Sequence, residues 1–188
     1  MIRAPSRKSY TKKASPSSII KNSLPDGDRA VHTKLGREGE NRVYEILCLI
    51  YGRNKVKMGD GTNGKPDLYV IEPHILVEVK SCELVKKDGS LGAAKTFVHS
   101  WMRLTRHADA RLMNRILVIE FRHKEQFLYV SITGEAMDKH VREHLDNDVV
   151  HIDFLKALEL GNILEIIPFE LESLDLPQTK LDEVMGVD

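Results

Sequence analysis

The segment Gly64–Cys82 constrains the fold of this chain more than any other, because it contains two strand signals separated by a turn. Residues 68–71 and 75–79 are short apolar runs rich in β-branched side chains, which are typical of strands. Between them lies Glu72-Pro73-His74, whose composition is typical of a turn. The sequence therefore predicts a β-hairpin around which the rest of the chain is organised.

Charged residues interrupt the second strand of this hairpin. Glu78 and Lys80 are two residues apart, so their side chains point to the same face, while Val79 between them points into the core. Burying an unpaired carboxylate costs several kcal/mol or shifts its pKa. A strand that carries this pair therefore predicts a functional use for the two charges.

A third charged residue, Asp67, directly precedes the first strand. Asp67 shares a face with Glu78 only if the loop has an even number of residues. A two-residue loop is disfavoured, because primed turns need a positive φ that proline cannot supply. We therefore expect a four-residue loop over 72–75, with Pro73 in the second position of a type I turn. This register places Asp67 near Lys80 and diagonal to Glu78, and two carboxylates beside one ammonium group suit a hard cation such as Mg²⁺.

Ten residues separate Pro66-Asp67 from Glu78-Val79-Lys80, and this PD-x10-EVK pattern resembles the PD-(D/E)xK nuclease superfamily over roughly residues 36–132. The resemblance implies an α/β protein with the restriction-endonuclease-like αβββαβ core, a central mixed sheet flanked by helices, here with a small C-terminal α+β appendage. It also implies metal-dependent hydrolysis of phosphodiester bonds in DNA. Asp67, Glu78 and the Val79 carbonyl would hold Mg²⁺ or Mn²⁺, and Lys80 would orient the attacking water or neutralise charge in the transition state.

The clearest helix is predicted over 34–51, where apolar side chains recur at helical spacing. Glu40 lies on the apolar stripe with Val43 and Leu47, the face expected to pack on the sheet. In the nuclease superfamily the first helix often brings a glutamate towards the metal. The resemblance therefore implies that Glu40 holds a second ion or a water molecule beside the first, and the alternative is a surface glutamate near a frayed helix start.

The glycine-rich segment 56–65 contains no GxxxxGK[ST] string, so it is not a phosphate-binding P-loop. It resembles the flexible loop before the PD strand in the superfamily, and the alternative interpretation is a plain surface loop. The resemblance implies contacts with DNA from this loop and from the first helix. The expected DNA-binding residues are Arg37, Lys57, Thr62, Asn63 and Lys65.

The remaining elements are expected in the order of the same core. The pattern predicts a second helix over 93–109, two strands over 116–121 and 127–132, and a third helix from Thr133, as N-cap, to about Leu145. The predicted domain organisation is a basic flexible arm (1–33), the nuclease core (34–133), an α+β extension of the same domain (134–172) and an acidic tail (173–188).

Composition excludes several other classes of protein. The 188 residues include no apolar run that approaches ~18 residues and no secretory signal, so we expect a cytoplasmic protein with no membrane partner. The two cysteines, Cys48 and Cys82, are too few for a disulfide framework and lack the spacing of metal ligands. The eight histidines are scattered and are interpreted as showing no HExxH or similar pairing.

The resemblance leaves the substrate and the biological role open. The small core, the GxxxE helix start and the basic arm are most similar to archaeal-type Holliday junction resolvases, which implies a homodimer that cuts branched DNA. A sequence-specific restriction enzyme or a phage or repair endonuclease acting on duplex DNA is the alternative. A non-catalytic DNA-binding module on the same fold, or a plain α/β scaffold, also remains open, since fold does not determine function.

Overall fold

The computed structural model describes residues 26–60 and 65–164, with side chains described from Lys34 onwards. The chain divides after Lys34 into two units. Helix α2 (Asp26–Tyr51) begins in the first unit and continues into the second. The predicted start of this helix at Lys34 was therefore wrong, because residues 26–33, assigned to the flexible arm, are already helical. The rest of the predicted arm and the predicted acidic tail lie outside the described residues.

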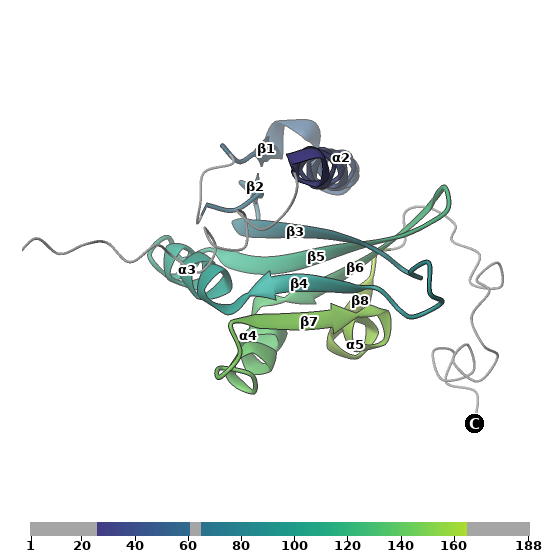
Figure 1. The fold of residues 1–188 in the computed structure, drawn as a ribbon. Coiled ribbons are helices and arrows are strands. Elements are labelled where there is room, and N and C mark those ends of the chain that lie inside the picture. The colour runs from purple at the N-terminus through teal and green to yellow at the C-terminus, as the bar shows by residue number, and fades with distance from the viewer. Residues whose placement is uncertain (1–25, 61–64, 165–188) are drawn as a thin grey trace, which may run out of the picture. The chain divides into compact units, whose positions relative to one another are not determined.

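A six-stranded mixed sheet forms the centre of the second unit, with strand order β1-β2-β3-β5-β6-β8 (Figure 1). Strands β3 and β5 are parallel, and the other neighbours in the sheet are antiparallel. The strands are β1 (Val56–Met58), β2 (Leu68–Val70), β3 (Ile75–Glu83), β5 (Asn114–His123), β6 (Gln126–Thr133) and β8 (Gly161–Ile163). The predicted α/β protein with a mixed central sheet is confirmed.

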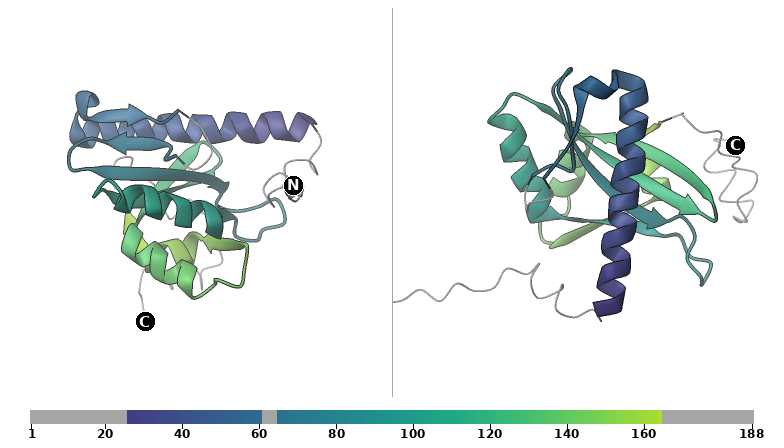
Figure 2. Two further views of the ribbon diagram at one scale, coloured as in Figure 1. Left: turned by 90° about the vertical axis from the view of Figure 1, so that its left-hand side faces the viewer. Right: turned by 90° about the horizontal axis from the view of Figure 1, so that it is seen from above.

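Helices cover both faces of this sheet (Figures 1 and 2). Val43 and Leu47 of α2 pack against Val77 and Val79 of β3, which lie on one face. Leu76 of β3 lies on the other face, in a second core cluster with the side chains of helix α3 (Val98–Asp109). Consecutive residues of a strand point to opposite faces, so a strand covered on both sides is apolar throughout except where function intervenes. The charges of β3 fall within such a strand.

A two-stranded antiparallel sheet of β4 (Ala93–Phe97) and β7 (Val149–Asp153) packs on the α3 side. The prediction of one helix over 93–109 was therefore wrong in its first five residues, which form β4. Alanines there favour a helix locally, but pairing with a strand some fifty residues later overrides that preference. When β4 is left out because it belongs to the smaller sheet, the order from α2 to β5 is one helix (α2), three strands (β1, β2 and β3), one helix (α3) and one strand (β5).

Two short helices complete the described part of the unit. Helix α4 (Gly134–Arg142) begins as predicted, with Thr133 as the N-cap, because the Thr133 side chain accepts a hydrogen bond from the Ala136 amide. It ends three residues before the predicted Leu145. A 3-10 turn, η1 (Arg53–Lys55), follows α2, and α5 (Phe154–Leu160) precedes β8. No helix within residues 26–60 and 65–164 combines the length and apolar character needed to cross a membrane.

Candidate active site

The β2–β3 hairpin brings Asp67 to the charged part of β3. Leu68 pairs with Val77 and Val70 with Ile75, which leaves a four-residue loop, 71–74. Extended by one residue, this register places Asp67 opposite Glu78. The sequence had predicted that Asp67 would lie opposite Lys80. The loop has the predicted even length but lies one residue earlier, and a shift of two in register keeps Asp67 on the predicted face.

The predicted turn type was wrong. The His74 amide donates a hydrogen bond of 3.2 Å to the Ile71 carbonyl, and the Glu72–Pro73 peptide bond is cis. Proline therefore occupies the third position of a type VI turn, not the second position of a type I turn.

Where β2 stops pairing with β3, the side chain of Asp67 replaces the backbone of β2 as the hydrogen-bond acceptor for β3. The Asp67 Oδ2 atom accepts a hydrogen bond of 2.7 Å from the Val79 amide, two residues beyond the last paired residue of β3. On its other edge, β3 continues in register with β5, where Val79 pairs with Val118. Asp67 thus covers the open edge of β3 at the point where the strand carries its two charges.

Glu78 and Lys80 form an ion pair at this edge. The Lys80 Nζ atom lies 2.5 Å from Glu78 Oε1 and 3.3 Å from the Val79 carbonyl oxygen. The side chains of Glu78 and Lys80 are 18% and 29% exposed, so both are within reach of solvent and of a ligand. Val79 itself is buried in the core that contains α2.

The electrostatics of the site is dominated by carboxylates. Burial, with a further contribution from Glu78, raises the pKa of Asp67 to about 7, although Lys80 and the Val79 amide oppose the shift. Burial also raises the pKa of Glu40 against the opposing charges of Lys80 and Arg37. Burial alone would lower the pKa of Lys80, but Glu78 and Asp67 outweigh it and the pKa is raised. We call Glu40, Asp67, Glu78 and Lys80 the carboxylate cluster.

The donor atoms of the carboxylate cluster are those that a hard divalent cation prefers, namely carboxylate and carbonyl oxygens. Glu78 and the Val79 carbonyl now accept from the Lys80 ammonium, so a cation bound to both atoms would replace that ammonium. The excess of carboxylates over cationic groups, together with the raised pKa of Asp67, fits such a cation.

Glu40 stands somewhat apart from the other two carboxylates. Among the described residues, Glu40, Asp67 and Glu78 do not form a trio whose ligand atoms all lie within 4.8 Å. Glu78 alternates onto the face of β3 opposite Val77 and Val79, which pack against α2. Glu40, carried by α2, therefore approaches Asp67, Glu78 and Lys80 from the other side of the strand, and within the described part of the chain it is joined to them by electrostatic interaction alone.

The predicted DNA-binding residues that the structure describes do not form a single group as the residues of the carboxylate cluster do. Arg37 is exposed on α2 and acts electrostatically on Glu40. Lys57 is exposed on β1, and Lys65 forms an ion pair with Asp60. Thr62 and Asn63 lie outside the described residues.

A buried glutamate that the sequence analysis did not single out holds α2 against the sheet. Glu120 of β5 is fully buried and accepts hydrogen bonds from Arg42 Nε (2.7 Å) and Nη2 (2.9 Å), and from Ser81 Oγ (2.6 Å). Tyr129 donates a further bond of 3.2 Å. A Cβ atom at Gly39 would lie 3.3 Å from Glu120 Oε1, so α2 approaches closely here. Because this network fixes α2 on the sheet, it also fixes the position of Glu40. The sequence signal for the network was Glu120 itself, an acidic residue within the apolar run ILVIEF.

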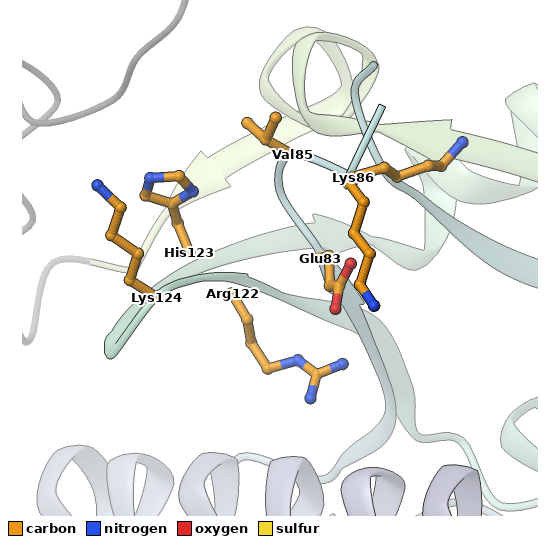
Figure 3. A pocket seen from close by; sticks show the side chains of 7 residues that line it. Glu83, Val85, Lys86, Arg122, His123 and Lys124 are labelled. Carbon is orange, nitrogen blue, oxygen red and sulfur yellow. The ribbon is translucent and has the colours of Figure 1, made fainter. Parts of the chain in front are cut away.

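A cationic pocket of about 330 Å³ opens at the end of β3 (Figure 3). Four cationic side chains and one carboxylate contribute to its lining, and we call it the basic pocket. Its residues are Glu83, Val85, Lys86, Lys87, Arg122, His123 and Lys124. Glu83 follows Lys80 by three residues, roughly 10 Å along a strand. The pocket combines the end of β3 and the segment after it with the end of β5 and the β5–β6 turn, so only a tertiary structure could reveal it.

Comparison with models of known protein families gave no match for this chain. Comparison with curated protein sequences gave no match either.

Proposed function

We propose that this chain is a Mg²⁺- or Mn²⁺-dependent DNA endonuclease of the PD-(D/E)xK type, with the restriction-endonuclease-like fold. The observation that carries the proposal is the meeting of Asp67, Glu78 and Lys80 where β3 extends beyond its pairing with β2. Two segments of one hairpin supply these groups, and a hydrogen bond that the Val79 amide of β3 donates to the Asp67 carboxylate joins them. Three charged side chains beside the core residues of β3 are costly unless a ligand uses them.

Asp67, Glu78 and the Val79 carbonyl are the groups that would hold the cation, with Glu40 beside them. The bound cation would polarise a phosphoryl oxygen and lower the pKa of an attacking water molecule. Lys80, released from Glu78, would place its ammonium where negative charge develops on the phosphoryl group. Hydrolysis of a phosphodiester bond without a catalyst is so slow that these groups together must lower the barrier by more than ~15 kcal/mol.

The basic pocket supports a nucleic acid as the substrate. Phosphates bind clusters of lysine and arginine, and four such side chains line the pocket. The pocket lies roughly 10 Å from Lys80 along β3, and Glu83 in its lining points to the face of the strand opposite Lys80, so it suits a phosphate at some distance from the cleaved bond. The overall neutral charge of the chain does not weaken this inference, because local patches determine where DNA binds.

We further propose a homodimer that prefers branched DNA, on the resemblance of the sequence to Holliday junction resolvases. A sequence-specific restriction enzyme or a phage or repair endonuclease, acting on linear duplex, is the alternative within the same class. The compartment proposed for all of these is the cytoplasm.

A second candidate function is a DNA-binding module without catalysis. The observation that favours it is the Glu78–Lys80 ion pair, because Lys80 already neutralises a carboxylate that the metal would need. Such a protein would bind DNA without cleaving it in Mg²⁺ or Mn²⁺.

The test is incubation of the purified protein with Mg²⁺, Mn²⁺ or EDTA and a panel of four-way junctions, linear duplexes and single strands. We expect cleavage that requires the metal and is strongest on the junction. Binding without any cleavage would overturn the nuclease in favour of the DNA-binding module, and equal cleavage of linear duplex would overturn the preference for branched DNA.

Glu78→Gln and Glu72→Gln provide a matched pair of variants. Both residues belong to the same hairpin, but Glu72 lies in its exposed turn and pairs with Lys55. Glu78→Gln should abolish cleavage and Glu72→Gln should preserve it. Loss of activity in both variants, or in neither, would contradict the assignment of Glu78.

A further inference from the structure

A second group of possible metal ligands lies at the end of α4, away from β3 in the sequence. The ligand atoms of His140, Glu143 and His144 all lie within 4.8 Å of one another. The two imidazole rings are 4.6 Å apart, measured between centroids. The interpretation that the histidines show no pairing was therefore wrong for these two. Residues spaced i, i+3 and i+4 meet on one side of a helical turn, so His140-x-x-Glu143-His144 was a readable signal.

The strongest indication of a bound ligand comes from His140. It is only 4% exposed, so it is more than nine-tenths buried. Neither of its ring nitrogens finds a hydrogen-bond partner within the part of the chain that the structure describes. A buried polar atom without a partner is costly, and unpaired cases in native proteins often mark a bound ion or water. A metal ion coordinated by His140 would remove this cost.

His144 is already oriented as a metal ligand. Its Nδ1 atom donates a hydrogen bond of 2.9 Å to the carbonyl oxygen of His140, which leaves Nε2 with a lone pair. Histidines that bind metals usually donate their other ring nitrogen to a carbonyl or carboxylate in this way, because the bond fixes the tautomer and the ring orientation. Glu143 is exposed and supplies a carboxylate free to turn towards the rings.

We propose that His140, Glu143 and His144 bind one Zn²⁺ ion. Two imidazoles and one carboxylate suit Zn²⁺ and related transition metals rather than Mg²⁺, which prefers oxygen ligands. Three protein ligands leave one position of a tetrahedral site for water or for a fourth group. The ion joins the last turn of α4 to the turn that follows it, so its binding stabilises this end of the helix. The proposal does not depend on nuclease activity.

Calorimetric titration of the purified, tag-free chain with ZnCl₂ tests this site, with thermal unfolding as the second readout. We expect one Zn²⁺ per chain and, at about a hundred times Kd, a rise in melting temperature of roughly 5 to 10 °C. The visible absorption spectrum of the Co²⁺-substituted protein should show tetrahedral coordination. Excess Mg²⁺ should not displace either ion.

His144→Ala is the informative variant, because His144 is half-buried and its removal leaves the core intact. We expect at least tenfold weaker Zn²⁺ binding in this variant, and the same in Glu143→Gln. His151→Ala, at an exposed position of β7, is the matched control and should bind Zn²⁺ as the unmodified chain does. Absence of Zn²⁺ binding to the unmodified chain, or unchanged binding in His144→Ala, would overturn the proposal.

Discussion

The Asp67 carboxylate accepts a hydrogen bond of 2.7 Å from the Val79 amide, although Asp67 precedes β2 and Val79 lies in the middle of β3. The bond occupies one carboxylate oxygen and leaves the other for a further partner. It favours the charged form of Asp67, yet burial and the neighbouring Glu78 still raise the pKa to about 7. A group held at this energetic disadvantage is typical of a site built for a ligand rather than for stability.

Asp67→Asn should therefore separate function from stability. Because the pKa of Asp67 is raised from 3.8 to about 7 on folding, the folded chain holds a proton that the unfolded chain releases between these values. The stability that this proton provides is present below about pH 4 and is lost as the pH rises to about 7. In EDTA at pH 8 the Asn variant should unfold at a higher temperature than the unmodified chain, yet cleave no DNA. A lower melting temperature would contradict this account, and melting curves at pH 4 and pH 8 supply the control.

Lys80→Ala should lose cleavage and keep DNA binding. The ammonium is proposed to stabilise charge in the transition state, and removal of one such group costs about 100- to 1,000-fold in rate. Removal of Lys80 also frees Glu78 and the Val79 carbonyl, so Mn²⁺ should bind more tightly. Single-turnover cleavage and Mn²⁺ titration measure the two effects. Full activity in the variant would remove Lys80 from the mechanism.

Alanine replacement of Lys86, Lys87 and Lys124 together should weaken DNA binding without slowing the chemical step. Each phosphate contact contributes about 0.9 to the slope of log K against log salt, so up to about 3 should be lost. Cleavage at saturating DNA should be unchanged. The control is Lys95→Ala on β4, an exposed lysine outside the basic pocket, which should leave the slope unaltered. An unaltered slope in the triple variant would exclude the pocket from DNA binding.

Replacing Arg42 should lower the free energy of unfolding by more than replacing its partner Glu120. Arg42→Ala leaves a fully buried carboxylate without its main partner and should cost about 3–5 kcal/mol of unfolding free energy. Glu120→Gln leaves a guanidinium that is 30% exposed and can reach water, so it should cost less. The double variant should cost less than the sum, since one partner is no longer stranded. Denaturant unfolding measures all three, and additive costs would contradict a direct interaction.

The grouping of Asp67 with Glu78 and Lys80 was accessible from the sequence because parity alone decides which residues of a strand share a face. The register expected for Asp67 was off by two residues, and an even shift keeps Asp67 on the side of Glu78 and Lys80. The exact partner of Asp67 depended on where the turn begins, and the residues Glu72-Pro73 do not determine that position. The strength of the prediction lay in charges placed directly after and between the core residues Ile75–Val77 and Val79.

Features that depend on distant segments were not accessible in the same way. Residues 93–97 carry alanines that favour a helix, and only their pairing with β7 makes them a strand. Arg122 at the end of β5 and Lys124 in the β5–β6 turn line the basic pocket, far in sequence from Lys86. Glu120 was visible as an acidic residue within an apolar run, but its partner Arg42 could not be inferred from spacing.

The buried Glu120 has a consequence for the way in which α2 can move. Sliding the helix by one turn, about 5.4 Å, would carry Arg42 out of reach and leave the buried Glu120 carboxylate without its main cationic partner. Intermediate displacements gain nothing, because the two-pronged guanidinium bond has a single alignment. The position of α2 along the sheet is therefore fixed. Any ion that Glu40 helps to bind would find this carboxylate in one defined place.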